Sequence, residues 1–138
     1  MLAALLSALC GCKSAPTPVP YAREYPVDVT RVPKTLDIQV FRRTYTIDFT
    51  NTTAREFGPS TLWLNRRFSY PITGVALAEQ VEIPLKQFKD EFSDQFRGGG
   101  FFASEAPDTL VMAELETADE NGATVMYGFT VIRGTPEN

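Results

Sequence analysis

The chain has 138 residues, of which 13 are lysine or arginine and 17 are aspartate or glutamate, so its net charge is −4. An acidic balance of this kind argues against a nucleic-acid partner. The chain contains no histidine, and its two cysteines stand at positions 10 and 12. These counts exclude Ser-His-Asp and Cys-His nucleophile systems as well as imidazole metal sites, and they leave the later residues without an internal disulfide.

The first nine residues form a continuous apolar run that is too short to span a bilayer as a helix. The motif Leu9-Cys10-Gly11-Cys12 ends this run and resembles the lipobox of bacterial prolipoproteins. The resemblance implies that residues 1–11 are a signal-peptide leader and that Cys12 becomes the acylated first residue of the mature protein. It also implies a location in the bacterial cell envelope, anchored by lipid to a membrane and facing the periplasm or the exterior.

The leader departs from the usual signal-peptide pattern, because no lysine or arginine precedes its apolar run. We therefore expect the true start of the protein to lie upstream and Met1 to be an internal methionine. The alternative interpretation is an apolar N-terminal strand or helix that packs on the folded domain. A soft-metal site at Cys10 and Cys12 would have only two ligands in an apolar leader, and we expect none.

Residues 12–34 are rich in proline and predict a tether between the lipid anchor and the domain. At about 3.1 Å per residue, an extended spacer of this length would reach on the order of 60 Å. The alternative is that its later half, which carries Tyr21 and Tyr25, lies along the domain as an edge segment. The prolines of this range are Pro16, Pro18, Pro20, Pro26 and Pro33.

From residue 35 onward, apolar and polar residues alternate with the period of two that is typical of half-buried β-strands. The pattern predicts strands over 35–40 and 44–50. A third strand is expected over 61–65, with Leu62 and Leu64 on one face and Trp63 on the other. A strand pair or one long bent strand is expected over 74–84.

One segment breaks this alternation. Its apolar positions, Leu85, Phe88, Phe92 and Phe96, recur at helical spacing and predict a short amphipathic helix over about 85–97 that ends at Gly98-Gly99-Gly100. We expect its phenylalanines to cap the open end of the β-structure. The alternative is that they form a membrane-facing surface.

The last part of the chain predicts a β-hairpin. A strand over 109–116 is followed by a loop in which Asn121-Gly122 suits a tight turn, and the strongest strand pattern of the chain runs over 124–133. We therefore expect one mainly β domain over 35–138, an immunoglobulin-like or related antiparallel β-sandwich of six to seven strands with one short helix. The hallmark cysteines of antibody domains are absent.

Two arginine pairs and two aromatic residues form the candidate interaction surface, namely Arg42, Arg43, Trp63, Arg66, Arg67 and Tyr70. Arginine and tryptophan are enriched at binding interfaces, and such a patch suits an envelope protein or an envelope polysaccharide. The alternative is that the arginines point outward from strands and cover apolar surface with their stems. We expect no catalytic residue, no cofactor and no metal site.

Two functions follow from these observations. The first is a non-catalytic envelope lipoprotein that presents its β-sandwich as an interaction or structural module. The second is a hydrolase of an envelope glycan or another polymer, which would need Asp90, Glu91 or Asp94 to face a second acid across a cleft. The lipobox-like motif, the proline-rich segment and the lack of nucleophile systems favour the first.

Overall fold

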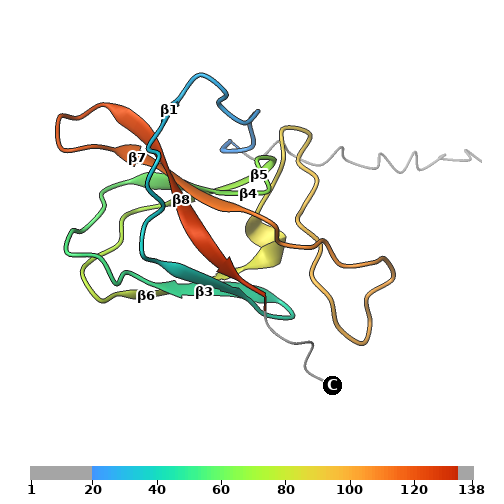
Figure 1. Ribbon diagram of the computed structural model, residues 1–138. Helices are drawn as coiled ribbons and strands as arrows, with labels where there is room; N and C mark the ends of the chain where they lie inside the picture. The colour runs from blue at the N-terminus through green and yellow to red at the C-terminus, as the bar shows by residue number, and fades with distance from the viewer. Residues whose placement is uncertain (1–19, 134–138) are drawn as a thin grey trace, which may run out of the picture.

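The computed structural model of the protein describes residues 20–133, which fold around two β-sheets (Figure 1). The leader-like run, Cys12 and the first part of the predicted tether lie outside the described residues, as do residues 134–138. The strands are β1 (Thr30–Arg31), β2 (Gln39–Arg42), β3 (Thr46–Thr50), β4 (Ser60–Leu64), β5 (Phe68–Ile72), β6 (Gln80–Pro84), β7 (Ala113–Ala118) and β8 (Thr124–Ile132).

Strand β8 belongs to both sheets. Its first six residues pair antiparallel with β7, while residues 130–132 pair in parallel with β2. The strand order is therefore β5-β4-β7-β8-β2-β3-β6, with β1 also paired to β8. This is the order of an immunoglobulin-like sandwich, in which the first strand of one sheet runs beside the last strand of the other.

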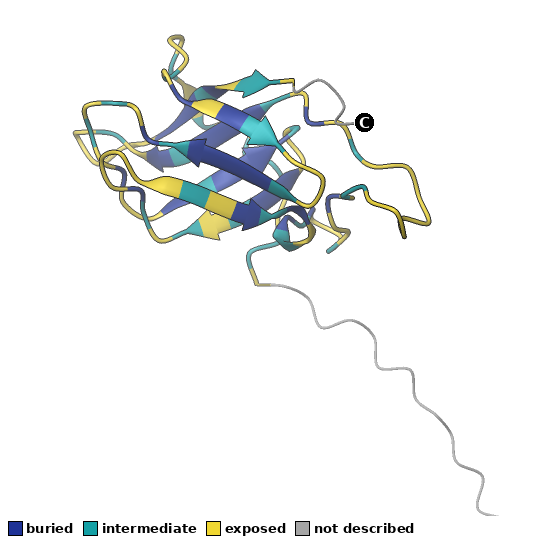
Figure 2. Cartoon of the chain, turned by 90° about the horizontal axis from the view of Figure 1, so that it is seen from below, coloured by how far each residue is buried: buried dark blue, intermediate teal, exposed yellow. Residues whose placement is uncertain are grey.

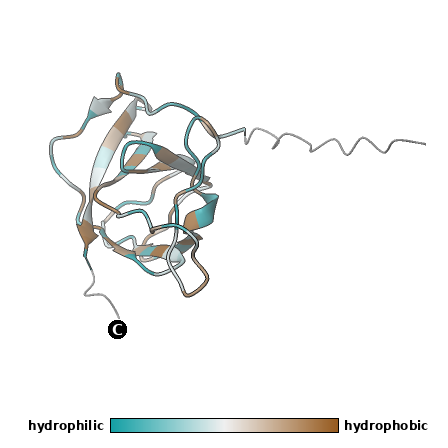
Figure 3. Ribbon diagram, turned by 90° about the vertical axis from the view of Figure 1, so that its right-hand side faces the viewer, coloured by the Kyte–Doolittle hydropathy of each residue, from teal (hydrophilic) through white to brown (hydrophobic). Residues whose placement is uncertain are grey.

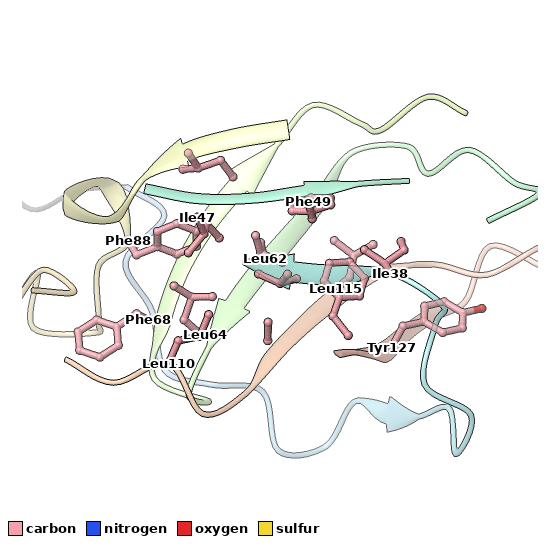
Figure 4. Close-up of a cluster of buried hydrophobic side chains, with 14 of the residues drawn as sticks. Ile38, Ile47, Phe49, Leu62, Leu64, Phe68, Phe88, Leu110, Leu115 and Tyr127 are labelled. Atoms are coloured by element: carbon pink, nitrogen blue, oxygen red, sulfur yellow. The ribbon is translucent and has the colours of Figure 1, made fainter. Parts of the chain in front are cut away.

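The sandwich interior is filled by side chains from alternate positions of the strands (Figures 2 and 4). Leu62 and Leu64 of β4 point into this core, as their spacing predicts, and Phe49 of β3 contacts Phe129 of β8 with ring centroids 5.3 Å apart. Buried apolar area of this kind is the main favourable term in folding. Apolar residues alternate with polar ones along the sequence because every second side chain of a strand points into this core.

The structure confirms the mainly β class and changes three details of the predicted strands. Eight strands are present in the described residues instead of six or seven, and the arrangement is mixed instead of antiparallel, because β1 and β2 both run parallel to β8. The strand expected over 74–84 is confined to β6, and Val75 forms only an isolated bridge with Phe57. The hairpin of β7 and β8 turns where Asn121-Gly122 predicts it, with Gly122 at a φ of 80°.

The helix expected over 85–97 is wrong. The chain makes a single 3₁₀ turn, η1 (Leu85–Gln87), and then becomes extended at Phe88. Phe88 and Phe96 face each other across a small loop, where the Phe96 N–H donates to the Phe88 carbonyl at 3.0 Å. Both rings are fully buried, whereas Phe92 at the tip of the loop is 76% exposed.

A local side chain competes with the helix for this backbone. The Asp90 carboxylate accepts hydrogen bonds from the backbone N–H groups of Phe92 and Asp94, and Ser93 adopts a φ of 67°. Aspartate and serine stabilise such turns at the expense of helix. The apolar spacing of four residues therefore marks the two sides of a loop and not one face of a helix.

We expect Phe88→Ala to lower the free energy of unfolding by about 3–5 kcal/mol, because it empties a fully buried position. The matched change Phe92→Ala should alter it by less than about 0.5 kcal/mol. Urea denaturation of both variants measures the difference. An equal loss of unfolding free energy in the two variants would contradict the loop. It would support the predicted helix, in which both rings lie on one face.

Candidate functional site

The N-terminal segment 20–31 crosses the outer face of the sheet that contains β4 and β7. It runs from Tyr21, whose hydroxyl donates to the Gln87 carbonyl, to Arg31 in β1 beside β8. Residues 20–34, the later part of the range predicted as a tether, therefore lie against the domain (Figure 1).

Trp63 lies beneath this segment. It points away from the sandwich core, as its alternation with Leu62 and Leu64 predicts, yet it is fully buried. The Tyr25 ring meets the indole edge to face at 5.2 Å, and the Arg23 guanidinium lies 4.8 Å from its centroid. Aromatic and cation–π contacts of this kind each contribute about 0.5–1.5 kcal/mol. They fix the segment to the sheet.

Two carboxylates of β7 hold the polar groups of this layer. Glu116 accepts hydrogen bonds from the Trp63 indole N–H at 2.7 Å and from Arg23 at 2.5 Å. The almost fully buried Glu114 accepts a hydrogen bond from the Tyr25 hydroxyl at 2.9 Å. It also forms ion pairs with Arg31 and, at 3.6 Å, with Arg66 Nε. Buried carboxylates need such partners to remain ionised.

Burial raises the pKa of Tyr25, and its contacts with Arg31 and Glu114 act in opposite directions on it. The hydroxyl is therefore the donor toward Glu114 at neutral pH. The neutral Tyr25 hydroxyl therefore joins the N-terminal segment to the Glu114 carboxylate without burying another charged group.

Arg66 stands in an unfavourable backbone conformation. The turn between β4 and β5 places Asn65 at a φ of 53° and Arg66 at 55°, as in the turns that close two-residue hairpins. Asn65 suits this region, and its Oδ1 accepts the Val111 N–H at 2.8 Å. Glycine is the usual residue at the second position, so the arginine there costs about 1–2 kcal/mol of backbone strain.

Arg67 is held by a third buried carboxylate. Its Nε and Nη2 lie 3.0 and 2.7 Å from Oδ2 of Asp90, which is 1% exposed. Burial by itself would raise the pKa of Asp90. The hydrogen bonds from Arg67 and from two backbone N–H groups outweigh this effect and hold its pKa below the ordinary value. Asp90 is therefore ionised at neutral pH. A carboxyl group that acts as a general acid needs a raised pKa, which Asp90 does not have.

These groups surround a shallow cavity of about 440 Å³ between the N-terminal segment and the loop at residues 90–92. The arginines at its edge have side chains that are 43–58% exposed, and Val27 and Phe92 beside them are largely exposed. We call this the arginine surface and define it by Arg23, Tyr25, Val27, Arg66, Arg67 and Phe92.

The structure distributes the six predicted interaction residues over two cavities and the packed interior. Arg66 and Arg67 belong to the arginine surface, and Trp63 lies under it. Tyr70 is half-buried against Tyr21 and Phe88.

Arg42 and Arg43 line a separate cavity with Gly99, Gly100 and Asp108. Arg43 pairs with Asp48 at 2.7 Å, and Arg42 donates to the Arg43 carbonyl. Nε and Nη2 of Arg42 are buried without a hydrogen-bond partner among residues 20–133.

Sequence reasoning missed Arg23, Tyr25, Val27 and Phe92. The signal for Tyr25 and Val27 was the aromatic and β-branched content of the proline-rich segment, which suggested an edge segment. Arg23 was not part of that signal. Phe92 was missed because the helical spacing of the phenylalanines predicted that it packs on the core.

Within residues 20–133, no group of three or more His, Cys, Asp or Glu side chains is arranged to hold a metal ion. No helix in the same range is long and apolar enough to cross a membrane. No protein-family model matches the chain, and neither a search of curated proteins nor a search of solved structures found a similar protein.

The ionised state of Asp90 generates a pH prediction. Because its pKa is lower in the folded than in the unfolded protein, its contribution is fully present above about pH 4 and is lost as the pH falls through the folded pKa. We expect Asp90→Asn to lower the free energy of unfolding at pH 7 by about 1–3 kcal/mol and by less at pH 3. Urea denaturation at both pH values measures this, with the exposed Asp94→Asn as control. An equal loss at both pH values would contradict it.

Proposed function

We propose that this protein is a lipid-anchored component of the bacterial cell envelope whose β-sandwich binds an envelope protein or polysaccharide and performs no catalysis. The anchoring part of the proposal is supported by the lipobox-like motif Leu9-Cys10-Gly11-Cys12. The binding part is supported by the arginine surface.

The observation that carries the binding proposal is the conformation of Arg66. A non-glycine residue in the left-handed region stores strain, and such strain is retained where the side chain serves a purpose. Glycine would relieve it at this turn position. Within residues 20–133, the Arg66 side chain lies 3.6 Å from Glu114 and 6.0 Å from the centroid of the Tyr25 ring. Both contacts are long, so they do not account for the strain.

The buried carboxylates beneath the surface support the same function. Glu116 holds Arg23, Glu114 lies beside Arg66, and Asp90 holds Arg67. Each guanidinium is thus restricted before a partner arrives, which reduces the entropy lost on binding. The half-exposed guanidinium groups and the exposed Phe92 ring offer the charged and aromatic contacts that dominate binding energy at interfaces.

The binding proposal predicts opposite effects of Arg66→Gly on stability and on binding. The free energy of unfolding should stay equal or rise by up to about 1 kcal/mol, because the glycine relieves the strain. Saturable binding of the fluorescently labelled protein to isolated cell envelopes should weaken by about tenfold or more.

The exposed Lys34→Gln variant removes one positive charge elsewhere and should bind as the unchanged protein does. If Arg66→Gly bound envelopes with unchanged affinity, or if the unchanged protein showed no saturable binding, the arginine surface would not be the binding site.

The anchoring proposal is tested at Cys12. We expect Cys12→Ala to leave the protein without an acyl chain and to release it from membranes washed with carbonate and high salt, because acyl chains provide the firm attachment. Cys10→Ala should remain with the membranes, since Cys10 would leave with the leader. Retention of the Cys12→Ala variant, or a mature mass without added lipid, would contradict the anchor.

A further inference from the structure

The end of the sandwich opposite the β7–β8 hairpin carries a loop at residues 98–107 with two phenylalanines (Figure 1, gold to orange at the right). Phe101 and Phe102 are 93% and 92% exposed, and their rings contact each other edge to face at 5.1 Å. Figure 3 shows this loop reaching beyond the strands. Two adjacent exposed rings on one loop form an apolar patch of the kind that marks an interaction site.

The surroundings of this loop are cationic although the whole chain is acidic. The two cavities beside the loop have volumes of about 830 and 790 Å³ and contain two acids, Glu105 and Asp108. Both acids pair with Arg97. The cations that line these cavities are Arg42, Arg43, Lys86, Arg97 and Arg133. Arg43 pairs with Asp48, so Arg42, Lys86 and Arg133 carry the positive excess among residues 20–133. An apolar tip surrounded by positive charge is complementary to an anionic bilayer surface.

The described chain begins at the same end. The Tyr21 hydroxyl donates to the Gln87 carbonyl in η1, and Lys86 in that turn lines the cavity that Phe102 also lines. Nine residue steps separate Cys12 from Tyr21, and they span at most about 32 Å when fully extended. A compact domain of this size is about 35 Å across. A lipid at Cys12 would therefore keep this end within reach of the membrane.

We propose that the loop at residues 98–107 inserts Phe101 and Phe102 into the interfacial region of an anionic phospholipid bilayer. The inference rests on the proposed lipid anchor, which supplies the high local concentration that a small apolar tip needs. Lys86 and Arg133, which are exposed and form no ion pair within residues 20–133, meet the lipid headgroups. Insertion orients the sandwich on the membrane and adds a second attachment to the acyl chain.

The test uses the full chain with Cys12→Ala, so that no acyl chain contributes to membrane binding. Phe102→Trp introduces an indole at the tip, and vesicles of phosphatidylcholine and phosphatidylglycerol with brominated acyl chains quench an inserted indole. We expect quenching of that indole, and less of it with phosphatidylcholine alone. The matched control is Leu77→Trp, because Leu77 is 56% exposed and precedes β6 at the opposite end of the sandwich. Its fluorescence should not change.

A second measurement compares sedimentation with the same vesicles. Phe101→Ser combined with Phe102→Ser should lower the partition coefficient about tenfold or more, whereas Leu77→Ser should leave it unchanged. Absence of quenching at position 102, or equal sedimentation of the double variant, would overturn the inference. The mass of the unsubstituted protein from membranes reports acylation separately. Quenching without acylation would therefore contradict the anchor alone, and acylation without quenching would contradict the loop alone.

Discussion

The pairing of β8 with strands of both sheets is the constraint on which the other features depend. Its N-terminal part bonds to β7 and its C-terminal part to β2, so one continuous backbone joins the two halves of the sandwich. Because β1 also pairs with β8, the chain entering β2 runs along the edge of β8, and the residues before β1 are held against the outer face of the β4–β7 sheet. The position of the N-terminal segment, and with it the cover over Trp63, follows from this pairing.

Buried carboxylates then determine what the outer surface presents. Glu114 and Glu116 face outward from β7 and would be solvated on an open sheet, but the N-terminal segment covers them and supplies the donors that they need. Asp90 is likewise buried, and it accepts hydrogen bonds from the loop after η1 and from Arg67. A charge buried in this way is stable only with its partners in place, so the arginines are positioned by the same contacts that hold the segment.

The sequence predicted the fold class more fully than the site. Alternation placed Leu62 and Leu64 in the core and Trp63 on the opposite face, and Asn121-Gly122 located the final hairpin. The helix over 85–97 failed because a spacing of three to four residues also describes the two sides of a small loop. The Asp90 carboxylate favours the loop through local hydrogen bonds to backbone N–H groups, and Arg67, 23 residues away, holds that carboxylate in place. The two arginine pairs look alike in sequence, but they line different cavities because they belong to different sheets.

The sequence by itself determined most of the strands and the position of the final hairpin, because side-chain alternation and turn chemistry are local properties of the chain. It did not predict β1 or β5. It also contains the lipobox-like motif at Cys12, on which the anchoring proposal rests. Only the tertiary structure decided that the proline-rich residues 20–34 cover a sheet face, that Phe92 is exposed, and that Arg23, Arg66 and Arg67 share one surface. These outcomes depend on strand order and on ion pairs between distant residues, which no local pattern encodes.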